Sequence, residues 1–308
     1  MPHRLVSAAP TASRARFLLA FAAVYLIWGS TYLAIRFAIE TVPPFLVGGF
    51  RFVIAGGLMY AWLRMRGVAR PTGLQWRSAW IIGPLLLTGG NGGIVWSEQY
   101  VPSGVVALMV ACVPLWMLLL AWLRGGGRPT MREWLGVAMG LAGVSLLVQL
   151  GATQDSGSVS PLGALVMLCS TLSWSIGSLI ARDAPLPDSP LLASAMEMLA
   201  GGAVMLVIAG LRGEFALLAA SSVSTRSALS ILYLAGFGSI VAFSAYKWLL
   251  SRVAPAVVGT YAFVNPVVAM LLGWAFAGEP LTGRLVLAMA LIVGAVAMIS
   301  LRPYLSQR

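Results

Sequence analysis

The sequence WGSTYLAIR at Trp28–Arg36 occurs a second time, in altered form, as WSIGSLIAR at Trp174–Arg182. Each copy carries a tryptophan and an arginine eight residues apart, and the copies are offset by 146 residues. A second pair of strings, SGVVALMVACVPLWMLLLAWL at Ser103–Leu123 and PAVVGTYAFVNPVVAMLLGWA at Pro255–Ala275, is offset by 152 residues. Periods this long are typical of a duplicated half, because solenoid repeats recur after 20 to about 50 residues. We therefore expect two related halves.

The composition excludes a soluble protein. Of the 308 residues 59% are hydrophobic and 9% are charged, with a mean hydropathy of +0.90, whereas about a quarter of the residues of a soluble domain are charged. The net charge of +11 does not indicate a nucleic-acid partner, because the arginines lie in short tracts between apolar runs and form no basic stripe. Cys112 and Cys169 both lie in apolar segments and are expected to be core residues.

Ten apolar segments are each close to the 20 residues that a membrane-spanning helix needs. They cover about 17–39, 44–65, 78–98, 103–123, 131–150, 161–181, 190–212, 229–251, 255–277 and 283–302. The expected organisation is a tail at 1–16, a first half at 17–150, an outer linker at 151–160, a second half at 161–302 and a tail at 303–308.

The arginine distribution predicts the orientation of these segments. If the N-terminus is cytoplasmic, fifteen Lys and Arg residues fall on the cytoplasmic side and only Arg212, Arg226 and Arg284 on the other. Five spans per half is an odd number, so the second half enters the membrane from the opposite face. The predicted fold class is an all-α membrane protein of ten transmembrane helices in two inverted five-helix repeats, with both termini cytoplasmic. Inverted repeats are typical of secondary transporters.

Ionisable residues inside spans are costly and are therefore candidates for function. Arg36 is one helical turn before Glu40 and is expected to pair with it at the outer interface. Arg51 is near enough to the outer boundary for its long side chain to reach the interface, which favours a structural anchor over a functional role inside the bundle. Glu197 is deeper and shorter, which leaves two readings: a proton acceptor or cation contact, or a structural hydrogen bond. Glu98, at the end of its helix, is expected to be solvated, with a vestibule residue as the alternative.

Aromatic and small polar residues recur at matching places in the two halves. Trp28 and Ser30 in the first helix correspond to Trp174 and Ser178 in the sixth. Trp28 is central in its span, where a tryptophan suits either a cavity wall that stacks on an organic solute or ordinary helix packing.

Buried amides and prolines form a further set of candidates. Asn91, within TGGNGG, and Asn265 need hydrogen-bond partners if they are buried. The glycines around Asn91 allow either close helix packing or a local break. Pro114 and Pro266 occupy equivalent places in helices 4 and 9 and are candidate hinges, or static kinks.

The inventory of reactive residues disfavours an enzyme. The single histidine, His3, is in the N-terminal tail, so neither a histidine-based metal site nor a Ser-His pair is expected in the membrane. No glycine-rich phosphate loop ending in Lys-Ser/Thr occurs, which disfavours ATP as direct energy source. No metal and no cofactor is expected.

Several strings in order resemble the EamA-type drug/metabolite transporters, whose members carry two such domains. The strings are WGSTYLAIR at Trp28, RFVIAGGLMY at Arg51, REWLGVAMGLAGVSLL at Arg132 and NPVVAMLLGWAFAGEPLT at Asn265. The resemblance covers residues 17–302 and is greatest to bacterial inner-membrane exporters. It departs in the first half, where RGGGRPT at Arg124–Thr130 replaces the Gly-Glu turn kept at Gly278–Glu279.

The resemblance implies a central cavity formed largely by helices 1, 3, 4, 6, 8 and 9. By position, the residues expected to line or border it are Trp28, Asn91, Trp174, Tyr246, Tyr261 and Asn265. Together with Ser30 and Ser178, these are the predicted substrate-binding residues.

The function predicted from these observations is secondary-active export of small organic solutes, such as amino acids or drugs, across the bacterial inner membrane. Alternating access is the expected mechanism, with protons or exchange as candidate coupling. An importer or facilitator, and less so a membrane scaffold or enzyme, are the alternatives. The expected partners are the small-molecule substrate and the lipid bilayer.

Overall fold

A computed structural model describes residues 14–125, 128–150, 160–250, 252 and 261–300. Most of the two predicted tails, nearly all of the linker and the first residues of the span predicted at 255–277 lie outside these ranges. The described residues form helices and no strands. Six helical segments are long and apolar enough to cross a membrane, and the apolar helices Val264–Ala277 and Gly283–Ala295 are shorter.

The described residues of the first half form ten helical elements. They are α1 (Arg14–Ala22), η1 (Ala23–Ile27), α2 (Trp28–Ala38), α3 (Pro44–Met65), α4 (Gly73–Gly83), η2 (Pro84–Gly92), α5 (Gly93–Ser97), α6 (Ser103–Val110), α7 (Val113–Leu123) and α8 (Met131–Leu150). The π-helical segment η1 joins α1 to α2 as one continuous helix. The α4–η2–α5 helix starts five residues before the predicted 78–98 span, because Thr72 and Gln75 form a capping box at its N-terminus.

The described residues of the second half form eight helical elements. They are α9 (Pro161–Asp183), α10 (Pro190–Leu211), α11 (Glu214–Ala220), α12 (Thr225–Tyr233), η3 (Leu234–Val241), α13 (Ala242–Leu250), α15 (Tyr261–Ala277) and α16 (Gly283–Ser300). The short helix α11 was not predicted, and α12 begins four residues before the predicted 229–251 span, where Ser224 caps it.

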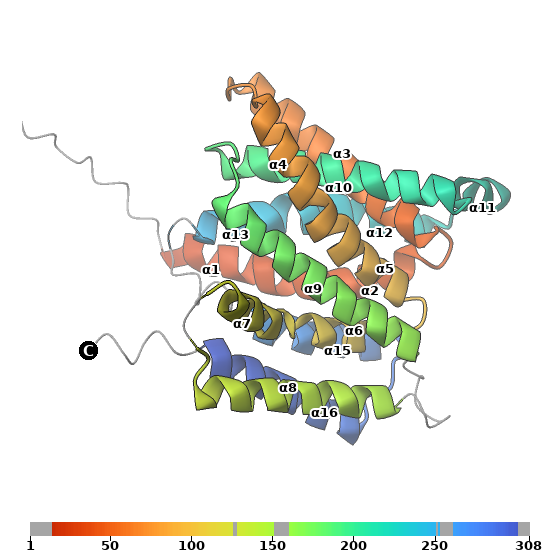
Figure 1. The fold of residues 1–308 in the computed structure, drawn as a ribbon. Coiled ribbons are helices and arrows are strands. Elements are labelled where there is room, and N and C mark those ends of the chain that lie inside the picture. The colour runs from red at the N-terminus through yellow and green to blue at the C-terminus, as the bar shows by residue number, and fades with distance from the viewer. Residues whose placement is uncertain (1–13, 126–127, 151–159, 251, 253–260, 301–308) are drawn as a thin grey trace, which may run out of the picture.

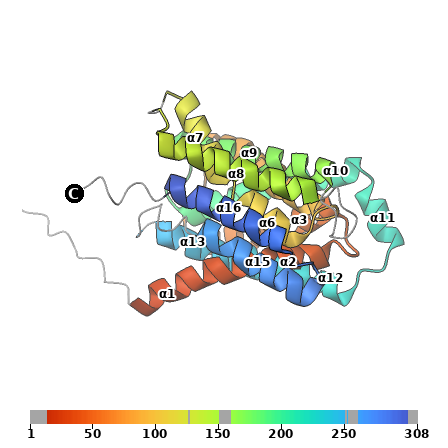
Figure 2. The same ribbon diagram turned by 90° about the horizontal axis from the view of Figure 1, so that it is seen from below.

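Two pairs of equivalent helices from the two halves pack against each other. The helix α3 lies along α10, and α8 lies along α16 at the opposite side of the bundle (Figure 1). Turning the molecule by 90° shows α8 and α16 again side by side (Figure 2). The helix α2 packs on α15 and α12, while α9 packs on α7 and η2. Elements from residues 14–150 therefore meet elements from residues 160–300 throughout the bundle.

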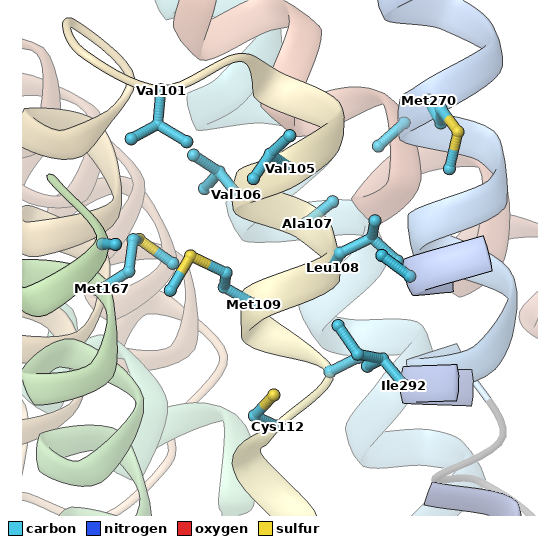
Figure 3. Packing of buried hydrophobic residues seen from close by; sticks show 14 of the residues in the cluster. Val101, Val105, Val106, Ala107, Leu108, Met109, Cys112, Met167, Met270 and Ile292 are labelled. Atoms are coloured by element: carbon cyan, nitrogen blue, oxygen red, sulfur yellow. The ribbon is translucent and has the colours of Figure 1, made fainter. Parts of the chain in front are cut away.

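One shared apolar core joins the halves on the side of α8 and α16. Leu108 and Met109 of α6 are fully buried, and they belong to one cluster with Met167 of α9, Met270 of α15 and Ile292 of α16 (Figure 3). Burying a large apolar side chain contributes about 1.5–3 kcal/mol in water, but lipid is as apolar as leucine, so close packing supplies the stability here.

Two glutamates of the second half cap helices of the first half. The helices α3 and α6 begin at prolines or directly after one, and neither has a capping side chain of its own. Glu214 Oε2 accepts a hydrogen bond from the Leu46 N–H at 3.1 Å, and burial raises the pKa of the Glu214 carboxyl. Glu279 accepts from the N–H groups of Ser103 and Gly104 at 2.7 and 3.1 Å.

Both caps are built in the same way. Each glutamate directly follows a glycine, Gly213 or Gly278, just after the end of a helix. These glycines have positive φ values of 72° and 66°. Because a residue with a side chain is strained at such φ values, glycine favours this turn, which directs the following carboxylate at the positive helix end. A Gly-Glu pair therefore links the two halves twice.

Replacing Glu279 with alanine is expected to lower the free energy of unfolding by about 2 kcal/mol, because two backbone N–H groups lose a charged acceptor. Thermal unfolding of the purified protein in detergent measures the change. Glu40, which is 41% exposed and bridges Arg226 at 3.4 Å, is the control, and Glu40→Ala should cost less than about 1 kcal/mol. Equal shifts for both variants would contradict the assignment.

Candidate transport cavity

A cavity of about 300 Å³ lies between the two halves. Its wall receives residues from α2, α3, η2, α5, α6 and α7 of the first half and from α9, η3, α13 and α15 of the second. The helices that line it agree with those that the resemblance implied, with α3 in addition. The volume is at the lower end of the range for small-molecule sites.

Trp28 is the centre of an aromatic wall. Its ring lies 5.2 Å from that of Tyr261 and 5.1 Å from that of Tyr246, measured between centroids. Its Nε1 donates a hydrogen bond to the Gly238 carbonyl at 3.1 Å, which fixes α2 to η3. Phe243 completes the cluster at 6.2 Å. An aromatic surface of this kind can stack on an organic solute.

Two π-helical segments contribute to the cavity wall. The segment η2 contributes Leu87, Gly90 and Asn91, and η3 contributes Gly238 and Ser239. A Cβ on Gly90 would lie 3.0 Å from the Trp174 ring, so glycine lets η2 approach α9 closely. Of the two alternatives considered for TGGNGG, the close packing is observed, and the helix continues through these residues as a π-helical segment. The widened π turns were not predicted, and such turns are frequent at functional sites.

Asn265 and Pro266 of α15 line the cavity. With its amide oriented to match its surroundings, Asn265 Nδ2 donates to the carbonyls of Tyr25 at 3.2 Å and Tyr261 at 3.3 Å. The amide therefore fixes α15 to the first helix. Pro266 is inside α15, while Pro114 stands at the start of α7, directly after an interruption at Ala111 and Cys112. A hinge role for either proline stays a prediction.

The structure places five of the eight predicted substrate-binding residues in the cavity wall: Trp28, Asn91, Trp174, Tyr261 and Asn265. Tyr246 is behind Trp28 and Tyr261 and supports them. Ser30 shares a 2.6 Å hydrogen bond with the Tyr233 hydroxyl, and Ser178 donates to the Trp174 carbonyl. The Ser30 hydroxyl therefore links α2 to α12, and the Ser178 hydroxyl forms a hydrogen bond within α9.

Glu197 is buried on α10, as predicted, but it does not belong to the residues that line the cavity. It lies where α10 meets α4, since a Cβ on Gly83 would be 2.4 Å from its carbonyl oxygen. Any coupling role of Glu197 would therefore act from outside the cavity wall.

Arg51 is a cavity residue that the sequence reasoning weighed as a candidate but placed at the membrane interface. The expectation of an interfacial anchor is wrong, because Arg51 is only 6% exposed and lines the cavity. Its Nε donates to Ser239 Oγ at 2.9 Å, and its Cζ lies 4.7 Å from the centre of the Phe52 ring. Depth along α3 does not determine the direction of a side chain, and at Arg51 the helix faces the cavity.

Two expectations at the outer end are also wrong. Glu98 is fully buried and not solvated, and its carboxylate oxygens have no hydrogen-bond partner among the described residues. Arg36 donates to the Glu98 backbone carbonyl at 2.7 Å and does not pair with Glu40, which bridges Arg226. Within the described ranges no three His, Cys, Asp or Glu side chains gather as metal ligands would.

Comparison with known proteins agrees with this architecture. The sequence matches the EamA-like transporter family at residues 15–149 and again at 161–301. It is 42% identical over 286 residues to the uncharacterized inner membrane transporter YedA of Escherichia coli K12, covering 92% of this chain and 90% of that protein. Protein PecM of Dickeya dadantii is 24% identical over 275 residues, covering 89% and 88%. A crystal structure at 25% identity superposes with a TM-score of 0.61, covering 94% of this chain and 98% of that one.

Proposed function

The chain belongs to the EamA-like transporter family, and from this premise we propose that it exports small organic solutes across the bacterial inner membrane by alternating access. Membership makes it a membrane transporter and not an enzyme. The proposal includes ten transmembrane helices in two inverted repeats with both termini in the cytoplasm, supported by the arginine distribution and the odd number of spans per half.

The observation that carries the mechanism is the cavity between the halves. Each half contributes a tryptophan, Trp28 and Trp174, and a π-helical segment to its wall. A site at the interface of two repeats opens to alternate sides when one repeat moves against the other. The relative that is 42% identical is named an inner membrane transporter, which supports the same location for this chain.

Solute flux tests the proposal. Proteoliposomes with purified protein should move at least one solute of a broad panel of amino acids, carboxylates, amines and nucleosides, with saturable kinetics and faster than empty liposomes. Loading solutes inside or outside shows whether a gradient drives net movement in either direction. Absence of flux for every solute would overturn the proposal.

Proton coupling through Glu197 has its own test. Since a carboxylate that carries the coupling proton must titrate, Glu197→Gln is expected to abolish the pH dependence of flux. Flux measured between pH 5.5 and 8.5 checks this, with the exposed Glu40→Gln as control. Unchanged pH dependence in Glu197→Gln would leave Glu197 a structural residue.

A further inference from the structure

Arg51 is the one charged side chain among the described residues that line the cavity. Among the described residues, only the Nε–H of Arg51 has a hydrogen-bond acceptor, which is Ser239 Oγ. Neither terminal nitrogen of the guanidinium donates to a described residue. Phe52 supports one face of the guanidinium. A guanidinium has five N–H donors in a rigid fork, so four remain for a ligand.

No described carboxylate lies within ion-pair distance of Arg51. The titratable groups that interact electrostatically with Arg51 are Tyr32 and Glu98, and Glu98 in turn interacts with Arg36 and Glu279. The carboxylate oxygens of Glu98 form no hydrogen bond with the described residues, so they are not hydrogen-bonded to the Arg51 guanidinium. A buried cation without a bound counter-ion is costly, and an anion in the cavity would offset that cost.

The rest of the wall restricts the kind of anion. Aromatic rings of Trp28, Trp174 and Tyr261 suit a flat or apolar body. Asn91 and Thr31 supply neutral polar contacts, and no acidic side chain is among the described lining residues. A substrate ammonium group would therefore meet Arg51 without a compensating carboxylate.

We propose that the cavity selects small organic carboxylates without a positive charge, held by the terminal nitrogens of Arg51 against the aromatic wall. The proposal rests on the proposed function, since it names the substrate class of the same cavity. A planar carboxylate matches the guanidinium fork with two parallel hydrogen bonds, which a neutral or cationic solute of the same shape cannot form.

Four probes of matched shape test the substrate class: 3-phenylpropionate, phenylalanine, phenethylamine and 3-phenylpropanol. Their affinities follow from thermal stabilisation of the purified wild-type protein in detergent. We expect 3-phenylpropionate to bind at least about tenfold more tightly than the amine, the zwitterion or the alcohol, given the strength of charge-assisted hydrogen bonds. Equal or tighter binding of the amine or of phenylalanine would overturn the proposal.

Variants test the residue. Arg51→Gln is expected to weaken carboxylate binding about 10- to 100-fold while the alcohol binds as before, and Arg51→Lys should fall between. The control Arg284→Gln removes an exposed arginine at the start of α16 and should change nothing. Ser239→Ala keeps the guanidinium and should retain the carboxylate preference, which allows a test if Arg51→Gln does not fold.

The outcomes separate this proposal from the proposed function. Equal loss of alcohol and carboxylate binding in Arg51→Gln would make Arg51 structural and overturn the inference. Flux of other solutes, with no binding or flux of any carboxylate in a panel of aromatic and aliphatic acids, would overturn the substrate class and leave transport standing. Absence of all flux would overturn transport itself.

Discussion

Replacing Gly83 with alanine is expected to destabilise the protein strongly, although it adds only one methyl group. A Cβ at Gly83 would lie 2.4 Å from the Glu197 carbonyl oxygen and 3.1 Å from the Gly201 nitrogen. A Cβ at Gly201 would likewise lie 2.6 Å from the Gly83 carbonyl oxygen. The obstacle on both sides is helix backbone, which cannot rotate away, so α4 and α10 must separate.

The expected cost is about 3 kcal/mol, at the upper end for overpacking a close contact. Thermal unfolding and the monodisperse fraction on size-exclusion chromatography measure it. Gly57→Ala is the matched control, because nothing lies within 4 Å of a Cβ at Gly57 and alanine favours a helix. A Gly83→Ala protein as stable as Gly57→Ala would contradict the described contact between the halves.

Replacing Trp28 with alanine is expected to abolish flux and to lower stability by about 3 kcal/mol, at the lower end for a large aromatic residue. The variant loses the contacts with Phe243, Tyr246 and Tyr261 and the hydrogen bond to the Gly238 carbonyl. Flux in proteoliposomes and thermal unfolding check both effects.

Two further variants separate packing from cavity function. Trp28→Phe keeps an aromatic ring and removes only the N–H donor, so it should cost about 1 kcal/mol and retain most flux. Trp62→Ala removes a tryptophan that is 47% exposed on α3 and should leave flux unchanged. Wild-type flux in Trp28→Ala would contradict the role of the aromatic wall.

The sequence predicts the helices well because length and hydropathy are local properties. The duplication also places Trp28 and Trp174 correctly in one cavity wall, since matching positions of two repeats face a shared interface. Ser30 and Ser178 show the limit of that reasoning. Their hydroxyls satisfy a neighbouring tyrosine and a carbonyl of their own helix, and no sequence pattern distinguishes those partners from a solute.

Depth along a helix is a poor guide to a buried charge when the direction of the side chain is unknown. Arg51 was expected to extend to the interface, but its helix turns it toward Ser239 and the cavity. Glu98 was expected to be solvated because it lies at the end of a helix, yet its side chain is fully buried. The Gly-Glu pairs at Gly213 and Gly278 are a sequence signal for two other glutamates, Glu214 and Glu279, which cap helices of the first half that have no capping side chain of their own.

The central claim is that the cavity opens alternately to the two sides of the membrane. A single cysteine at Thr31, which lines the cavity, tests it in a protein whose Cys112 and Cys169 are replaced by alanine. A small membrane-impermeant thiosulfonate reagent is applied to right-side-out and to inside-out vesicles. Leu58→Cys, on a residue of α3 that is 61% exposed, is the control expected to stay unlabelled in lipid.

Alternating access predicts that Thr31→Cys is labelled in both vesicle orientations, since each conformation exposes the cavity to one side. This measurement needs no knowledge of the substrate. Labelling from only one side, or from neither, would contradict the account.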